Sequence, residues 1–294
     1  MILDAPSPAV SQAAKGAGTL YVVATPIGNL EDLSARARQI LSSVELIAAE
    51  DTRHSGKLLQ VLGCHTPMLS LHEHNEVHRT DELLARLKQG LDVALISDAG
   101  TPLISDPGYN LVNELTQQGI RVVPIPGACA AIAALSVAGL PTGRFAFEGF
   151  LAAKPNKRRE RLRELLREER TLVFYEAPHR CRETLEDMVT VLGGTRRIAI
   201  CRELTKLHET SYYGDLATLA ARAAEDADLS RGELVFVVEG ASAVEGMATT
   251  LDAEQLLSAL LEELPASQAA KVAAKITGVE RAQLYERAIS LKGK

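Results

Sequence analysis

The most informative stretch of this chain is Ser97-Asp98-Ala99-Gly100-Thr101-Pro102-Leu103-Ile104-Ser105-Asp106-Pro107-Gly108. It directly follows the apolar run Val93–Ile96, which is typical of a buried parallel strand. Its glycines, prolines and aspartates predict a tight loop. Open α/β sheets bind ligands at the carboxyl ends of their strands, and small residues let a ligand approach the backbone. The stretch therefore predicts a binding loop, with an ordinary tight connection as the alternative.

The chain repeats this arrangement of strand and loop on both sides. Tyr21–Ala24 leads into Thr25-Pro26-Ile27-Gly28-Asn29-Leu30, and Val122–Ile125 leads into Pro126-Gly127-Ala128-Cys129-Ala130. Three such loops on one sheet converge on one crevice. None of them has the G-x-G-x-x-G or the G-x-x-x-x-G-K-[ST] pattern, so neither a standard dinucleotide site nor a standard triphosphate site is indicated.

Composition indicates an ordinary soluble protein with room for two domains. The chain has 294 residues, of which 46% are hydrophobic and 24% are charged. It has no apolar run near the length of a membrane span, so no membrane association is expected. Residues 1–18 are rich in Ala, Pro, Ser and Gly and lack a basic start and an apolar core, which predicts a disordered tail and not a secretory signal.

The cysteines indicate a reducing compartment. Cys64, Cys129, Cys181 and Cys201 are scattered, without a C-x-x-C pair. This spacing argues against a disulfide framework and a zinc site, and we expect a cytoplasmic protein.

Charge is distributed unevenly along the chain. The net charge is −6, which alone argues against a nucleic-acid partner. Residues 154–170, however, hold eight Lys or Arg against four Glu, and residues 265–294 hold six against two, so each segment carries a net +4. Segregated charge is expected where a polyanion docks on part of a surface. Two solvated helix faces are the alternative.

The first half of the chain alternates strands and helices, which predicts a mostly parallel sheet covered on both faces. Expected strands are Tyr21–Ala24, Val44–Ala49, Met68–Leu71, Val93–Ile96 and Val122–Ile125, and expected helices lie near Leu33–Leu41, Lys57–Leu62, Asp81–Lys88 and Tyr109–Gln118. The first α/β domain is placed at residues 19–127.

A second α/β domain is placed at residues 128–240. A small-residue helix near Ala128–Ala138 is followed by a break at residues 139–143. Expected strands are Phe145–Phe150, Leu172–Tyr175, Ile198–Cys201, Glu209–Gly214 and Leu234–Val238, and expected helices are Lys157–Arg167, Arg180–Val191 and Leu216–Ala224.

A linker at residues 240–250 separates a C-terminal helical hairpin at residues 250–294. Its helices are expected at Ser267–Ile276 and Glu280–Leu291, with Ser267 as N-cap and Gly278 as the C-terminal stop.

Taken together, the loops identify a family. The chain resembles the tetrapyrrole methylase superfamily, which uses S-adenosylmethionine, and within it the bacterial 16S ribosomal RNA (cytidine-2'-O)-methyltransferases. The resemblance covers about residues 19–240. It rests on the segments 24–30, 49–53, 71–76, 97–108, 126–130, 175–180 and 201–206, which occur in that order.

The resemblance implies a fold and a cofactor site. It implies two α/β domains with S-adenosylmethionine in the cleft between them, and a homodimer. It places the cofactor against Ile27, Ala99, Gly100, Thr101, Ile104, Cys129, Ala130 and Glu176. Asp98 is also expected at the cofactor, as an acceptor for a hydroxyl or an ammonium, although capping of its own turn is the alternative.

Methyl transfer to a ribose hydroxyl needs alignment and an acceptor for a proton. The candidates for this proton acceptor are Glu203, Lys206 and His54. Further histidines with the same chemistry are His72, His74 and His179. Residues 202–206 follow an apolar strand, as groups that serve a site often do, and a buried lysine with a lowered pKa can act as a base. A surface pair of Arg and Glu is the alternative.

The RNA is expected at basic residues outside the loops. Arg53 is a candidate for a phosphate or sugar contact, although it also suits a structural salt bridge with Asp51. The basic segments add Lys157, Arg158, Arg159, Lys271 and Lys275. His72 and His74 lie two residues apart near Glu73 and Glu76, but the spacing offers no fixed third ligand, so no metal is expected.

The resemblance implies an S-adenosylmethionine-dependent enzyme that methylates the ribose 2'-hydroxyl of a cytidine in the decoding centre of 16S ribosomal RNA. The expected substrate is 16S RNA or the small ribosomal subunit. A methyltransferase acting on a small tetrapyrrole has the same fold and cofactor but does not need two basic segments. A non-catalytic module that binds the cofactor is the third possibility, and the polar residues crowded at the loops argue against it.

Overall fold

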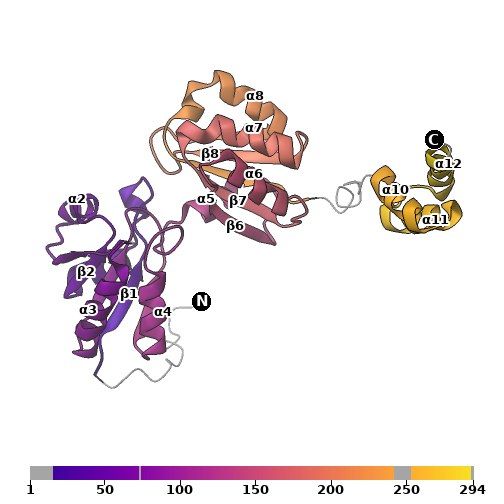
Figure 1. Cartoon of the computed structure of the whole chain (residues 1–294). Coiled ribbons are helices and arrows are strands. Elements are labelled where there is room, and N and C mark those ends of the chain that lie inside the picture. The colour runs from indigo at the N-terminus through magenta and orange to yellow at the C-terminus, as the bar shows by residue number, and fades with distance from the viewer. Residues whose placement is uncertain (1–15, 73, 242–252, 293–294) are drawn as a thin grey trace, which may run out of the picture.

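The computed structural model describes residues 16–72, 74–241 and 253–292 (Figure 1). Most of the predicted tail, residues 1–15, lies outside the described residues. Its last residues are not a tail, because Ala17 packs against a hydrophobic core cluster and the Gly18 N–H donates to the Leu87 carbonyl at 2.7 Å. No helix in the described part of the chain is long and apolar enough to cross a membrane.

The first unit is a five-stranded parallel sheet in the order β3-β2-β4-β1-β5. The strands are β1 (Thr19–Val23), β2 (Leu46–Ala49), β3 (Met68–Ser70), β4 (Val93–Ile96) and β5 (Arg121–Ile125). All residues of β2 and β4 are buried. The apolar runs of the sequence fit a parallel sheet for this reason, since such a sheet is covered on both faces.

Two helix pairs cover the two faces of this sheet. The helices α1 (Ala35–Ser43) and α2 (Thr52–Leu62) contribute to one core cluster, and α3 (Glu76–Lys88) and α4 (Tyr109–Gln117) contribute to the other. A short 3-10 helix, η1 (Leu30–Asp32), precedes α1. The predicted start of α2 at Lys57 is wrong by about one and a half turns. The Asp51 carboxylate accepts from the Arg53 N–H and begins the helix at Thr52, a cap that the apolar pattern alone does not reveal.

The second unit is a mixed five-stranded sheet in the order β6-β7-β10-β8-β9. The strands are β6 (Phe145–Phe150), β7 (Thr171–Glu176), β8 (Arg197–Arg202), β9 (Thr210–Asp215) and β10 (Leu234–Val238). β6 pairs parallel with β7, and β10 runs antiparallel between β7 and β8. The carboxyl ends of β6 and β7 therefore lie at the same edge as the beginning of β10.

Helices cover this second sheet unequally. α6 (Pro155–Glu164), α7 (Cys181–Leu192) and α8 (Leu216–Glu225) pack on one face and form the largest core cluster. Only α5 (Ala130–Val137) contributes helical side chains to the core on the other face, as far as the described residues show. Short 3-10 turns, η2 (Pro178–Arg180) and η3 (Ala227–Ser230), complete the unit.

The C-terminal part is a unit of three helices, α10 (Ala253–Glu263), α11 (Ala266–Thr277) and α12 (Arg281–Lys292), with a small core of their own. The predicted hairpin had only two helices and lacked α10. Gly278 ends α11 in the left-handed conformation, with φ +71°, as predicted. The prediction of Ser267 as N-cap is wrong, because the helix begins one residue earlier and Pro265 takes the cap position without a side-chain hydrogen bond.

Candidate functional site

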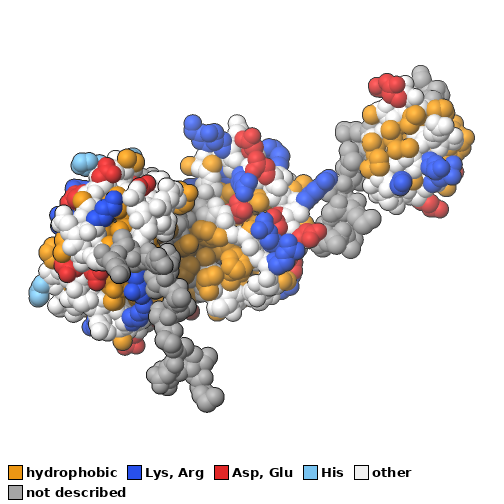
Figure 2. Space-filling model, turned by 90° about the horizontal axis from the view of Figure 1, so that it is seen from below, with side chains coloured by type: hydrophobic (Ala, Val, Ile, Leu, Met, Phe, Trp, Pro, Cys, Tyr) orange, Lys and Arg blue, Asp and Glu red, His pale blue; other side chains and the backbone are white. Residues whose placement is uncertain are grey.

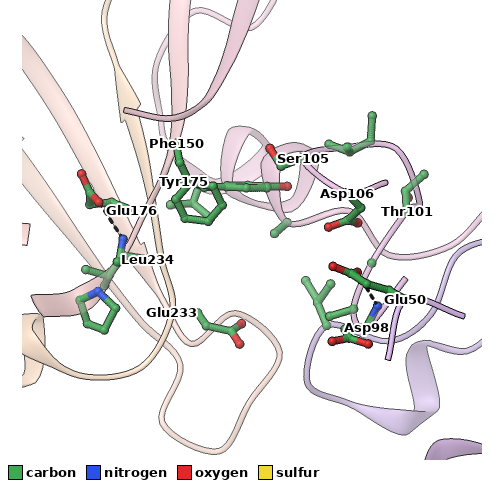
Figure 3. A pocket seen from close by; sticks show the side chains of 18 residues that line it. Glu50, Asp98, Thr101, Ser105, Asp106, Phe150, Tyr175, Glu176, Glu233 and Leu234 are labelled. Atoms are coloured by element: carbon green, nitrogen blue, oxygen red, sulfur yellow. Dashed lines mark hydrogen bonds between the residues drawn. The ribbon is translucent and has the colours of Figure 1, made fainter. Parts of the chain in front are cut away.

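A cavity of about 440 Å³ lies where the carboxyl edge of the first sheet faces the second sheet (Figure 3). The first sheet contributes residues that follow β1, β2 and β4. The second sheet contributes the ends of β6 and β7 and the beginning of β10. The lining residues are Ile27, Glu50, Asp98, Ala99, Gly100, Thr101, Ile104, Ser105, Asp106, Ala130, Phe150, Tyr175, Glu176, Ala177, Pro178, Glu233, Leu234 and Val235. The size is that of a pocket for a small molecule, roughly 300–1,000 Å³.

The three predicted loops converge here, as expected. Thr25 and Gly100 exchange backbone hydrogen bonds of 2.8 and 3.1 Å, which join the loop after β1 to the loop after β4. The Thr101 hydroxyl donates to the Ala128 carbonyl at 2.9 Å and adds the loop after β5. Gly100 has φ +79°, and a Cβ there would lie 3.2 Å from Cγ2 of Ile27. This position therefore requires glycine for its conformation and for the approach of Ile27.

Backbone strain gathers in two loops beside the cavity. Among the described residues, only four other than glycine have a positive φ: Leu103 (72°), Ser105 (69°), Glu203 (51°) and Thr205 (66°). The first two lie in the loop after β4, and the other two lie in the loop after β8. Such conformations are costly and persist where the surrounding structure enforces them, which is common at functional sites.

Carboxylates dominate the polar lining of the cavity. Glu50, Asp98 and Asp106 lie on one side, and Glu233 lies across from them (Figure 3). Burial raises the pKa of Asp106 to about 6, against a hydrogen bond from Ser97 and with added repulsion from Glu50 and Asp98. Among the described lining residues none is Lys, Arg or His. The cavity therefore favours a ligand that carries positive charge.

Aromatic rings form an apolar wall opposite the loop after β4. The Tyr175 ring packs edge-on against Phe147 and Phe150, with centroids 4.9 and 5.6 Å apart. The Tyr175 hydroxyl accepts from the Ala131 N–H at 3.2 Å, and burial raises the pKa of this hydroxyl. Phe150 keeps 57% of its surface exposed. Two aromatic rings at the ends of neighbouring strands give a flat surface on which a ring of a ligand can lie.

Most residues that were expected to bind the cofactor line this cavity. They are Ile27, Asp98, Ala99, Gly100, Thr101, Ile104, Ala130 and Glu176. Cys129 does not line it. This residue packs with the apolar core behind Tyr175, so its expected direct contact is not supported by the lining. Sequence reasoning did not select Phe150, Tyr175 or Glu233. Phe150 and Tyr175 lie at the carboxyl ends of β6 and β7, which was a usable signal.

Two of the expected ligands have other partners. One Asp98 carboxylate oxygen accepts from the Asp51 N–H at 3.2 Å, so Asp98 also caps a neighbouring turn. The buried Glu176 carboxylate accepts from the Ala177 N–H at 2.8 Å and from the Thr184 hydroxyl at 2.5 Å, and it lies 3.3 Å from the Arg180 guanidinium. The carboxylate of Glu176 therefore stabilises the wall, and its partners leave it little capacity for a ligand.

A second hollow of about 560 Å³ adjoins the first. The two share Ile27, Asp98, Ala99 and Glu233. The second hollow adds basic and apolar groups from the loop after β1, from α2 and from the loop after β8. These residues are Pro26, Gly28, Leu30, His54, Lys57, Leu58, Val61 and Lys206. Two catalytic candidates, His54 and Lys206, therefore lie together beside the acidic cavity, and Glu203 does not line either hollow.

Lys206 is held as a cation by two carboxylates. Its ammonium lies 2.9 Å from Glu203 Oε1 and 3.1 Å from Glu233 Oε2. Partial burial opposes the charge, but the hydrogen bonds to Glu203 and Glu233 raise the pKa of Lys206 above its ordinary value. The expectation of a lysine with a lowered pKa is therefore wrong. Glu203 is also a charged partner: burial opposes ionisation, yet the Lys206 ammonium and the Glu233 N–H lower its pKa.

The residues expected to bind RNA differ from one another in burial and in ion pairing. Arg158 is buried and pairs with Asp187 at 2.6 Å and with Glu183 at 3.5 Å, so it is a structural residue and the RNA prediction for it is wrong. Arg159 pairs with the same Asp187 and remains partly exposed.

Arg53, Lys157, Lys271 and Lys275 are exposed. Arg53 pairs with Asp51 at 3.1 Å, the salt bridge that was the alternative for this residue. Among the residues with described side chains, no ion pair involves Lys157, Lys271 or Lys275. These three lysines can therefore meet phosphates without first losing a partner.

No metal site is evident in the part of the chain that the structure describes, where no group of three or more His, Cys, Asp or Glu side chains is arranged to hold an ion. The His72 ring lies 3.2 Å from the side-chain nitrogen of Asn75, and all four cysteines are free thiols.

Comparison with protein families matches two regions of the chain. Residues 19–220 match the model of the tetrapyrrole (corrin/porphyrin) methylases, and residues 248–292 match an RsmI C-terminal HTH domain. The second match spans the three C-terminal helices.

Comparison with curated proteins finds relatives along nearly the whole chain. A ribosomal RNA small subunit methyltransferase I from Pseudomonas aeruginosa is 54% identical over 279 residues, covering 95% of this chain and 99% of the relative. The protein of that name from Escherichia coli O157:H7 is 50% identical over 276 residues, covering 94% and 96%.

Comparison with solved structures finds the same fold at lower identity. The uroporphyrin-III C-methyltransferase from Thermus thermophilus, in complex with S-adenosylhomocysteine, has a TM-score of 0.53 at 19% identity and covers 76% of this chain and 97% of its own. Diphthine synthase has a TM-score of 0.55 at 13% identity, covering 76% and 90%.

Proposed function

The chain belongs to the tetrapyrrole methylase family, and from this premise we propose that it transfers a methyl group from S-adenosylmethionine to the RNA of the small ribosomal subunit. The observation that carries this proposal is the pair of adjoining hollows. One is acidic and walled by aromatic rings, and the other contains Lys57 and Lys206. A cationic cofactor suits the first hollow, and the exposed Lys57 of the second can contact a phosphate.

The specific methylation site that we propose is the ribose 2'-hydroxyl of a cytidine in the decoding centre of 16S RNA. Support for an RNA target comes from relatives at 48–54% identity that are named for small-subunit ribosomal RNA and match more than nine-tenths of this chain. The solved structures of tetrapyrrole enzymes share only 13–23% identity and cover about three-quarters of it. The exposed lysines on α6 and α11 fit the same target.

The residues present suit S-adenosylmethionine. When bound, this cofactor supplies a methyl group on a cationic sulfur, which a nucleophile displaces in line. Glu50, Asp98 and Asp106 offer negative charge to the cation, and Phe150 and Tyr175 exclude water from one side. The backbone hydrogen bonds between Thr25 and Gly100 fix the loop after β4. The backbone groups of this loop are therefore in position before a ligand binds.

We also propose a homodimer that buries the α5 face of the second sheet. Ile132, Val137, Phe145 and Tyr213 are 52%, 46%, 39% and 57% exposed, and the Tyr213 hydroxyl donates to the Val137 carbonyl, so β9 adjoins the end of α5. Figure 2 shows hydrophobic side chains gathered on the second sheet unit. An apolar face of this kind is typical of an interface between subunits. Light scattering that gives a monomer at micromolar concentration would contradict this part.

The cytoplasm is the proposed location, because the four cysteines are free thiols and the substrate is ribosomal RNA.

The proposed function is tested by mass spectrometry of 16S RNA from cells that lack the protein. One ribose methylation should be absent, and it should return when the wild-type gene is supplied. A complete set of methylated nucleotides in the deletion strain would overturn the RNA assignment. Loss of a methylated tetrapyrrole instead would favour the small-molecule alternative.

A further inference from the structure

Glu233 lies at the boundary between the two hollows. Only Ile27, Asp98, Ala99 and Glu233 line both of them in the described structure. Two of the four carry a titratable group. If the cofactor lies in the acidic hollow and the ribose in the other, the reacting atoms meet at this boundary.

Several contacts fix the backbone and the side chain of Glu233. Its N–H donates to Glu203 Oε1 at 2.8 Å, and its carbonyl accepts from the Glu203 N–H at 2.9 Å. One oxygen of its carboxylate lies 3.1 Å from the Lys206 ammonium. The side chain is nevertheless 73% exposed and extends into the cavity toward Asp98 (Figure 3). Glu233 is therefore held in position while its carboxylate stays accessible.

Two other candidates, Asp98 at the boundary and Lys206 in the second hollow, are less suitable as proton acceptors. Asp98 already accepts a hydrogen bond from the Asp51 N–H, and it stands beside Glu50 and Asp106 on the acidic side. Lys206 bears its proton, because its two carboxylate partners raise its pKa, and an ammonium has no lone pair to accept another.

We propose that Glu233 is the general base of the reaction, accepting the proton of the ribose 2'-hydroxyl as methyl transfer proceeds. This inference rests on the proposed function. The 2'-oxygen forms a bond to the methyl carbon while the carbon–sulfur bond breaks. The electron pair of the broken bond stays on sulfur. The O–H bond breaks, and the proton passes to the Glu233 carboxylate. The products are the 2'-O-methyl ribose, neutral S-adenosylhomocysteine and protonated Glu233, which returns its proton to water after product release.

In this scheme Lys206 and Glu203 are positioning residues. Lys206 orients the Glu233 carboxylate, and Glu203 binds both the Lys206 ammonium and the Glu233 backbone. Gly28 adds a steric constraint, because a Cβ there would lie 2.3 Å from Cγ of Lys206. The loop after β1 therefore packs directly against the lysine that orients the base.

The charged groups around Glu233 set the conditions of the test. Lys206 and Glu203 face it from the loop after β8, Glu50, Asp98 and Asp106 face it across the cavity, and His54 and Lys57 line the adjoining hollow from α2. Since Asp106 also titrates near pH 6, the rate must be measured at saturating S-adenosylmethionine at every pH.

The test compares Glu233→Gln with wild type in single turnovers, between about pH 5 and pH 9, on small subunits isolated from a strain without this protein. Gln keeps a carbonyl that can accept from Lys206, so it removes the base and preserves the hydrogen bond. We expect the rate constant to fall about 10²–10⁴-fold. The fall should be seen at every pH in this range. Affinity for S-adenosylmethionine by calorimetry should change less than about threefold.

Two further variants make the result specific. Glu233→Asp keeps a carboxylate and should retain more of the rate than Glu233→Gln, an order that a purely structural role does not predict. Glu186→Gln is the matched control, because Glu186 also forms an exposed ion pair, with Arg182 at 2.8 Å on α7, and it does not line the cavity. It should behave as wild type.

An unchanged rate in Glu233→Gln would overturn the inference while the wild type methylates RNA. If the wild type binds the cofactor but transfers no methyl group to small-subunit RNA, the proposed function fails instead. A Glu233→Gln variant that loses cofactor affinity in proportion to its rate would make Glu233 a binding residue and would also overturn the inference.

Discussion

The two strained loops, which both contribute residues to the second hollow, differ in what they leave open. The loop after β4, Ser97–Gly108, joins its neighbours mainly through backbone groups and leaves carboxylates facing the cavity. In the loop after β8, residues 203–206, the charges are paired, because Lys206 lies between Glu203 of the same loop and Glu233 just before β10. Both contain two residues with positive φ. Similar strain therefore supports a binding surface on one side and a fixed ion network on the other.

This difference predicts separate roles for the two loops in binding and in catalysis. Negative charge that faces a cavity attracts a cationic ligand, so the loop after β4 should control affinity for the cofactor. A network that is already paired has little to gain from binding, but it can hold one group at a defined position. The loop after β8 should therefore control the rate of the reaction.

The largest effect should come from filling the space at Gly100. Gly100→Val places a branched side chain against Ile27 in a backbone conformation with φ +79°. S-adenosylmethionine affinity should fall more than about 100-fold in calorimetry, since the displaced loop closes the cavity. Gly119→Val is the matched control, because Gly119 has φ +69° and nothing lies within 4 Å of its Cβ position. Equal affinity in Gly100→Val and wild type would remove the binding role of this loop.

The next effect concerns the opposite loop. Glu203→Ala removes one of the two carboxylates that hold Lys206 and also the acceptor for the Glu233 N–H. Turnover at saturating cofactor should fall about 10- to 100-fold, the cost of losing a hydrogen bond to a charged group. Cofactor affinity should be nearly unchanged. Steady-state kinetics that show a raised KM for S-adenosylmethionine with unchanged kcat would contradict the division between the loops.

A smaller effect is expected from pH. Asp106 has a pKa of about 6, raised by burial, so it is neutral below this pH and charged above it. A cationic ligand favours the charged form, and affinity for S-adenosylmethionine should therefore decrease as the pH falls below about 6, by at most about tenfold per pH unit. Asp106→Asn should flatten this dependence, whereas Asp81→Asn on α3 should leave it unchanged. A wild-type affinity that rises toward acid would contradict the sign.

The same titration affects stability in the opposite sense. The ordinary pKa of an aspartate is 3.8, so between about pH 4 and pH 6 the folded protein binds this proton more tightly than the unfolded chain does. The contribution of Asp106 to the free energy of unfolding should then decrease as the pH rises through this window. Urea unfolding of Asp106→Asn, compared with wild type at about pH 4 and pH 7, checks the direction. A larger gain for the variant at the lower pH than at the higher one would be inconsistent with the raised pKa.

The smallest effect is expected from a substitution on α6, which lies outside both loops. Lys157→Glu should weaken binding to the small subunit a few-fold, and it should reduce the slope of log affinity against log salt by roughly one, because a single lysine–phosphate interaction is removed. Cofactor affinity should not change, because Lys157 does not line the cavity. Lys88→Glu on α3 is the control for the change in charge. An identical salt slope in all three proteins would show that α6 does not contact RNA.

The sequence predicts the architecture well because the apolar runs and the Gly/Pro loops carry local signals. The β4 strand and the three converging loops are examples, and the resemblance to the family implied the second domain. Partners that are distant in sequence carry no such signal. Arg158 looks like an exposed cation in a basic segment, and only its contact with Asp187 reveals a structural role. Glu233 was missed because it meets Lys206 only after β8 and β10 pair.

The acidic cavity, as we propose, holds the methyl donor for small-subunit RNA. The most direct test of this proposal is transfer of a radioactive methyl group from S-adenosylmethionine to small subunits isolated from a strain without this protein. Wild-type protein should place about one label per subunit, on a ribose 2'-oxygen of the RNA, and Gly100→Val should place none. Label that stays out of the RNA with wild-type protein, or enters it equally with Gly100→Val, would contradict the account.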